Sequence, residues 1–178
     1  MSYVLAIDIG TSSVRAALYD FAGNVLPASM VKNKRQLIAT DDGGAEIDAS
    51  EALAQIETAI DDVLEKAKNI EGEISTVAAS SFWHSLVGIN SNGEPTTKVF
   101  GWADTQSRKY VSALRENFDE AAAHNRTGAR FHSSFWTAKL LWLGQERKEI
   151  FKTTAQWLSF SDFAALKFFG QAQTSVSM

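Results

Sequence analysis

The sequence has 178 residues, of which 45% are hydrophobic and 21% charged, with a formal net charge of −4 and no cysteine. This is the composition of an ordinary globular domain, long enough to bury a core without disulfides or metals. The absence of cysteine excludes a disulfide framework, a thiolate zinc site, an iron–sulfur cluster and a cysteine nucleophile, and it suits a reducing cytoplasm.

The charge and hydropathy patterns also exclude two classes of partner. No basic stretch is longer than Lys32–Arg35, which argues against binding to nucleic acid. No apolar run approaches the roughly 20 residues that cross a bilayer, and the N-terminus lacks the features of a signal peptide. We therefore expect a cytoplasmic chain that binds neither nucleic acid nor a membrane.

The N-terminal part of the chain predicts three strands in succession, at Tyr3–Asp8, Val14–Tyr19 and Val25–Val31. A turn-rich loop of hairpin length separates the second strand from the third. Continuous apolar runs in the first two strands are typical of central strands that are buried on both faces. Asp48 followed by Glu51 has the pattern of a capping box and predicts the start of a helix.

Apolar residues at helical spacing continue that helix to Ala67. Beyond it, strands are predicted at Ile74–Ser81 and Leu86–Ile89, with a break between them at Trp83 and His84. The remaining chain is predicted to be mostly helical, with Asp104 as the N-cap of a helix through about Phe118 and further helices at Phe135–Arg147 and Leu158–Phe169.

The most informative motif is the stretch Asp8–Arg15, where the first predicted strand ends and the second begins. It is not a Walker A loop, because the pattern G-x-x-x-x-G-K-[ST] is absent from the sequence. The motif offers a glycine, three hydroxyls and exposed N–H groups, which suit phosphate oxygens. Asp8 alone would repel a phosphate, so the arrangement requires Mg²⁺ between the two, and Arg15 could donate to a phosphoryl group. A plain polar turn is the alternative interpretation of the motif by itself.

Its place between two apolar strands, before a capped helix, resembles the phosphate-binding domain of the actin-like ATPase superfamily. Four stretches of the sequence, the first of which overlaps this motif, narrow the resemblance to the FGGY family of carbohydrate kinases over essentially the whole chain. The stretches are Ala6–Ser13, Ser81–Leu86, Trp102–Ser107, and Thr127–Gly128 with Ala138–Leu143, and a weaker fifth comprises Trp157–Phe163 with Thr174–Met178. The resemblance implies an α/β fold of the ribonuclease H-like type, with a mixed sheet led by a βββ unit and flanked by helices.

The same resemblance implies that residues 1–178 form the N-terminal, substrate-side domain of an enzyme that transfers the γ-phosphoryl of ATP to a sugar hydroxyl with Mg²⁺. It assigns the metal to Asp8 and the phosphate groups to Thr11, Ser12, Ser13 and Arg15. The nucleotide-side domain and the catalytic base would lie outside this chain, so the isolated chain is expected to be nearly inactive. Whether the full-length protein forms a homodimer is left open.

For the sugar, the resemblance implies a set of aromatic and polar side chains: Trp83, His84, Trp102, Asp104, His132 and Ser134. Asp104 is expected to cap the helix that follows it, with the sugar contact as an additional role, and a buried structural histidine is the alternative for His84. Three other tryptophans, Trp136, Trp142 and Trp157, are expected in the core.

The motifs are most similar to those of the gluconate-kinase-like branch, which implies gluconate as the substrate. Arg130 is then the candidate cation for the sugar-acid carboxylate. Xylulose, ribulose or another polyol is the alternative substrate within the family. A non-catalytic actin-like binding module is the alternative of another class.

Overall fold

A computed structural model describes residues 1–174, and its contacts divide the chain into two compact units. Unit 1 comprises Met1–Leu37 and Ser50–Phe82, and unit 2 comprises Ile38–Ala49 and the chain from Trp83 onward. Residues 175–178, which end the weakest of the family-like stretches, lie outside the described residues. None of the helices within residues 1–174 is long and apolar enough to span a membrane.

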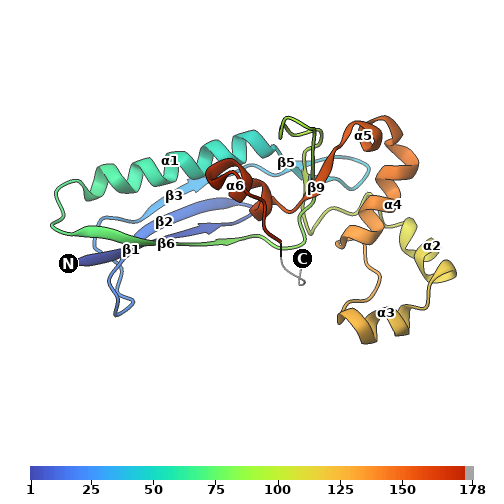
Figure 1. Ribbon diagram of the computed structural model, residues 1–178, viewed down its shortest axis with the longest axis horizontal. Helices are drawn as coiled ribbons and strands as arrows, with labels where there is room; N and C mark the ends of the chain where they lie inside the picture. Colours follow the sequence, from blue (N-terminus) through green and yellow to red (C-terminus); the bar gives the residue numbers. More distant parts are fainter. Residues whose placement is uncertain (175–178) are drawn as a thin grey trace. The chain divides into compact units, whose positions relative to one another are not determined.

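Unit 1 is built on a mixed four-stranded sheet with the order β3-β2-β1-β6. The strands are β1 (Ser2–Ile9), β2 (Ser13–Tyr19), β3 (Val31–Lys34) and β6 (Glu73–Ser81). β2 is antiparallel to both of its neighbours, whereas β6 runs parallel to β1. A parallel pair needs a crossover connection, and α1 (Ala49–Ala67) forms the helical part of that crossover and lies along the sheet (Figure 1).

The core of unit 1 lies between α1 and one face of this sheet. Side chains alternate between the two faces of a strand. Accordingly, Leu5, Ile7 and Ile9 of β1 are buried, while Asp8 is exposed on the other face. The buried side chains of α1 recur at helical spacing and include Ala52, Ile56, Ala59 and Val63.

The predicted third strand at Val25–Val31 is wrong, because β3 begins only at Val31. Pro27 has no N–H group for a strand ladder, and Ala28 has a φ of 64°, which ends extended backbone there. The buried side chain of Ser29 instead accepts a hydrogen bond from the Leu18 N–H at 3.1 Å. A hydroxyl thus replaces the carbonyl that a paired strand would have offered.

Unit 2 contains, among its described residues, two small antiparallel sheets and five helices. One sheet has the order β4-β5-β8 and the other pairs β7 with β9. The strands are β4 (Ile38–Ala39), β5 (Ala45–Ile47), β7 (Val87–Ile89), β8 (Val99–Phe100) and β9 (Gln156–Leu158). The helices are α2 (Tyr110–Asn117), α3 (Glu120–Thr127), α4 (Trp136–Glu146), α5 (Lys148–Thr153) and α6 (Phe160–Phe169).

The core of unit 2 confirms the expectation for the three tryptophans. Trp142 is 3% exposed and clusters with Leu86, Phe100 and Leu143. Trp136 and Trp157 are partly buried and pack against this cluster.

Two predicted helix starts are wrong. Asp104 caps no helix, because α2 begins at Tyr110 with Lys109 at its N-cap. Leu158 is the last residue of β9, and α6 begins after Ser159, which forms a capping box with Asp162. Asp104 accepts hydrogen bonds from backbone groups instead of capping a helix. Ser159, one residue beyond the predicted start at Leu158, is the residue that caps α6.

Candidate functional site

The predicted phosphate turn is the tight connection between β1 and β2 in unit 1. The Gly10 N–H donates to the Ser13 carbonyl at 2.9 Å, which closes the turn around Thr11 and Ser12. A Cβ atom at Gly10 would lie 3.0 Å from the same carbonyl oxygen, so the turn leaves almost no room for a side chain there. Ser12 is exposed and Thr11 is partly exposed, whereas Ser13 is only 5% exposed. Thr11 and Ser12 are therefore the accessible hydroxyls.

Asp8 and Arg15 face each other in register across β1 and β2. Arg15 Nη1 lies 3.6 Å from Asp8 Oδ2, and both side chains are more than half exposed. The Ser80 hydroxyl donates to Asp8 Oδ1 at 3.3 Å. The carboxylate keeps accessible lone pairs and therefore fits a hard cation such as Mg²⁺. Because no group of three or more acidic, histidine or cysteine side chains gathers within the described residues, water and phosphate oxygens would have to complete the coordination.

Arg35 supports the phosphate turn, a role that no pattern in the sequence indicates beyond the basic stretch Lys32–Arg35. Its Nη1 donates to the Gly10 carbonyl at 2.9 Å, and its backbone N–H donates to the Ser12 carbonyl at 2.8 Å. Its Nε donates to Gln55 Oε1 of α1 at 2.8 Å. The side chain is 8% exposed, and burial lowers the pKa of its guanidinium. Arg35 thus ties the turn to the helix that covers the sheet, which its position in the sequence did not reveal.

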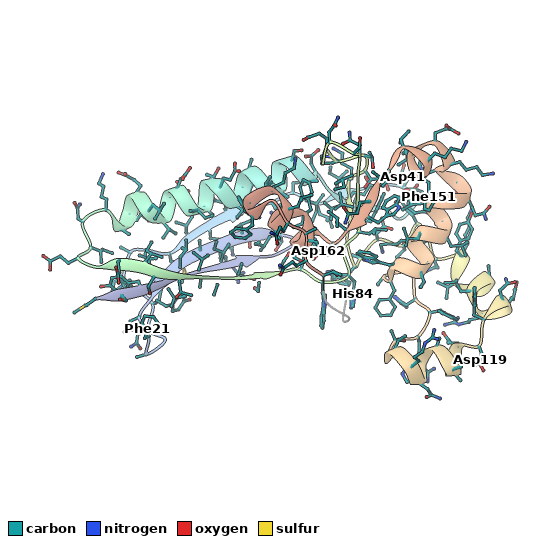
Figure 2. All side chains as sticks on the ribbon, viewed as in Figure 1. Phe21, Asp41, His84, Asp119, Phe151 and Asp162 are labelled. Carbon is teal, nitrogen blue, oxygen red and sulfur yellow. The ribbon has the colours of Figure 1, made fainter. Side chains whose placement is uncertain are left out.

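The predicted sugar-binding residues lie in unit 2, starting with Trp83 and His84. Trp83 is 55% exposed, and its ring stacks on the His84 ring at a centroid distance of 5.2 Å. His84, which is labelled in Figure 2, has a φ of 56°, in the left-handed region. The next residue, Ser85, is fixed from two sides. Trp136 Nε1 donates to its carbonyl at 2.8 Å, and the Phe160 N–H donates to its hydroxyl at 2.9 Å.

The surroundings of His84 favour the neutral form of its imidazole. Burial lowers its pKa, and the positive charge of Lys139 lowers the pKa further. A neutral imidazole both donates and accepts a hydrogen bond, which suits a sugar hydroxyl. The sequence predicted a break between two strands at this position. In the structure the break presents a partly exposed histidine, as a binding role requires.

Trp102 and His132 are held together through Ser134. The Ser134 hydroxyl donates to the Trp102 carbonyl at 2.7 Å, and the Ser134 N–H donates to His132 Nδ1 at 3.1 Å. Nδ1 is therefore the acceptor nitrogen, and a neutral His132 carries its proton on Nε2. Trp102 is 57% exposed, so its aromatic face is available to a ligand. The N–H group at Nε2 of a neutral His132 adds a hydrogen-bond donor beside it.

Asp104 is completely buried, unlike the other members of the predicted set. Its Oδ2 accepts the Ala45 N–H at 3.1 Å and its Oδ1 accepts the Gln106 N–H at 3.3 Å. Burial raises the pKa of this carboxyl, while the two backbone hydrogen bonds and Lys139 act in the opposite direction. In this structure the carboxylate holds the Trp102 loop to β5, and its contact with a sugar stays a prediction.

The structure places all six predicted sugar residues in unit 2, and Phe135 contacts two of them. The Phe135 ring lies edge-on to His84 at 4.7 Å and to His132 at 6.1 Å. Arg130 is exposed in the segment between α3 and α4. The five predicted phosphate and metal residues share unit 1.

Comparison with known proteins gives a consistent result. Residues 3–178 match the N-terminal domain of the FGGY family of carbohydrate kinases. A gluconokinase of Bacillus subtilis is 27% identical over 170 residues, which are 96% of this chain and 32% of that protein. An autoinducer-2 kinase of an Enterobacter species is 29% identical over 178 residues, covering 96% of this chain and 32% of that protein.

A solved structure of a ligand-bound xylulose kinase from Lactobacillus acidophilus is similar to 97% of this chain and 34% of its own, with a TM-score of 0.87 and 26% identity. The chain thus spans about a third of the length of the proteins that it matches. The mixed α/β architecture with the fold of these kinases, predicted from the sequence, is confirmed.

Proposed function

We propose that this chain, which belongs to the FGGY family of carbohydrate kinases, supplies the phosphate turn and the acceptor-sugar residues of an ATP-dependent sugar kinase. The observation that supports this best is the glycine turn of unit 1, with two accessible hydroxyls and Asp8 beside Arg15. In the proposed reaction an acceptor hydroxyl oxygen bonds to the γ-phosphorus of ATP while the bond to the β–γ bridging oxygen breaks. ADP leaves, and the hydroxyl proton passes to a base.

The residues of unit 1 would act by positioning phosphate oxygens. Thr11, Ser12 and the N–H groups of the turn would donate to them, and Arg15 would pair with their charge. Mg²⁺, held by Asp8, would supply neutralisation of the charge on the phosphate groups. No residue of this chain is assigned as the base, so we propose that the chain alone transfers phosphate at a negligible rate.

Gluconate is the proposed acceptor, in keeping with the motifs and with the similarity to a gluconokinase. Xylulose and the substrate of the autoinducer-2 kinase stay as alternatives, because relatives with those names are equally similar. Exposed aromatic faces at Trp83 and Trp102 would pack on the C–H groups of any of these acceptors. Arg130 would then distinguish an acid from a neutral sugar. A cytoplasmic location and a homodimer also stay predictions.

The test is ADP release by the longer polypeptide that contains this chain, with gluconate, xylulose, ribulose and glycerol as acceptors. Turnover that depends on one of them supports the kinase, and the preferred acceptor identifies the substrate. Sugar binding to the 178-residue chain by calorimetry, without turnover by the longer polypeptide, would instead favour a non-catalytic binding module.

A further inference from the structure

Lys139 is a buried cation to which neither the phosphate turn nor the predicted sugar contacts give a role. It lies in α4 and has no exposed surface. Burial lowers its pKa to about 8, against the attraction of Asp104. At neutral pH the ammonium is therefore still charged, and a buried charge is costly unless its partners compensate for it.

The Lys139 ammonium donates a hydrogen bond to a backbone carbonyl next to the predicted sugar residues. Lys139 Nζ donates to the Ser133 carbonyl at 2.8 Å. The Ser107 hydroxyl donates to the same oxygen at 3.0 Å. Ser107 and Ser133 are 0% and 5% exposed, so this shared acceptor is shielded from water. We call the three residues the Ser133 clamp.

The Ser133 clamp connects segments that are far apart in the sequence. Ser133 lies between His132 and Ser134, and Ser134 in turn donates to the Trp102 carbonyl. The Lys139 ammonium is also attracted by Asp104, which follows Trp102 in the chain and accepts the Gln106 N–H. One carbonyl oxygen thereby joins α4 to both loops that present Trp102 and His132.

We propose that Lys139, with Ser107, is a positioning residue of the acceptor-sugar site, which holds the Ser133 carbonyl and so fixes His132 and Trp102. This proposal rests on the sugar-binding function proposed above. Because Lys139 has no exposed surface, it would act through these residues and not by touching the sugar.

Amide hydrogen exchange on the 178-residue chain tests the clamp directly. Lys139→Met keeps the length of the side chain but removes the donor and the charge, and Lys152→Met changes an exposed lysine of the same unit as a control. Exchange of the Ser134 and Gln106 amides should rise about tenfold in Lys139→Met alone, as expected for loss of one charged hydrogen bond. Unchanged exchange in a folded Lys139→Met variant would overturn the proposal.

Ser107→Ala keeps the proposal testable if Lys139→Met fails to fold. It removes the second donor to the same oxygen and leaves the lysine in place. The Ser134 amide should again exchange faster, and the effects of the two substitutions should be non-additive because they share one acceptor. No change in Ser107→Ala, or strictly additive effects, would count against a shared clamp.

The kinetic readout separates positioning from a purely structural role. In the active longer polypeptide, Lys139→Met should raise the KM for the sugar about tenfold and leave the KM for ATP and kcat nearly unchanged. If Lys139→Met only reduced the fraction of folded molecules, the apparent kcat would fall instead and the KM for the sugar would not change. An unchanged sugar KM would refute the positioning role only, whereas a wild-type enzyme that phosphorylates no sugar would refute the proposed function itself.

Discussion

His84 holds a backbone conformation that residues with a side chain rarely adopt. Strain of this kind persists where the surroundings fix it, and it is concentrated at binding sites. Here Ser85 is fixed by Trp136 and Phe160, which lie 51 and 75 residues away in the sequence. The sequence therefore predicted a break at Trp83 and His84 but not its conformation, because the groups that impose it belong to distant elements.

Asp8 gives the first prediction at the residue scale. Asp8→Asn should lower kcat of the longer polypeptide by about 100-fold or more, because the amide keeps the size of the side chain but loses the charge that a metal and phosphate site needs. ADP release at saturating sugar measures this. Asp61→Asn, on an exposed position of α1, is the control. Equal turnover of the Asp8 variant and the wild type would exclude the proposed metal role.

Lys139 gives a pH-dependent prediction. Its pKa in the folded chain is about 8, below the ordinary value of 10.5. Between these values the unfolded chain keeps a proton that the folded chain has lost, so raising the pH stabilises the folded wild type. The free energy of unfolding of the wild type relative to Lys139→Met should therefore increase from about pH 8 to pH 10, by at most about 1.4 kcal/mol per pH unit. Urea unfolding of both proteins measures this difference, and a difference that is flat with pH would contradict the prediction.

At the scale of elements, the sequence was informative where a pattern is long and local. The strand at Ile74–Ser81, the helix ending at Ala67 and the helix at Phe135–Arg147 were predicted to within one residue of the observed ends. Pro27 and the positive φ of Ala28 end the predicted strand at Val25–Val31, and that error shares one further feature with the error at Asp104. In each, a polar side chain forms a hydrogen bond to a backbone group of another element, which strand and helix patterns do not encode.

Ser29 gives the prediction that belongs to this scale. Ser29→Ala should lower the free energy of unfolding by about 1–3 kcal/mol, because the buried Leu18 N–H of β2 loses its acceptor. Denaturant unfolding measures the effect, with Ser91→Ala in an exposed turn as the control. Equal stability of the two variants would mean that the Leu18 N–H has another acceptor.

At the scale of the whole chain, β6 leaves unit 1 with an open edge. Within the described residues it pairs only with β1, and Val77 is 59% exposed. The sheet face away from α1 also carries a hollow of about 630 Å³, lined partly by Ala6, Ala17 and Ala78. An exposed edge with apolar side chains is a template for pairing with another chain.

We therefore expect the 178-residue chain to self-associate as its concentration rises. Val77→Lys should suppress this association, because a charge on an edge strand opposes strand pairing. Sedimentation velocity over a series of concentrations measures it. Val25→Lys, which adds the same charge to an exposed position outside the sheet strands, should leave the association unchanged. Equal association of all three proteins would show that β6 is not the interface.

The division of the chain has a consequence for its synthesis on the ribosome. Ile38–Ala49, which includes β5, interrupts unit 1 but belongs to unit 2. β5 pairs with β8, which begins at Val99, after the last residue of unit 1 at Phe82. All of unit 1 thus emerges before β5, which already has β4 on one side, meets β8 on the other, so unit 2 is completed late. A cut after Phe82 keeps all of unit 1 but separates β5 from β8, and a cut before Ile38 keeps all of unit 2 but divides unit 1. A chimaera between relatives therefore cannot exchange one unit at a single junction without dividing the other.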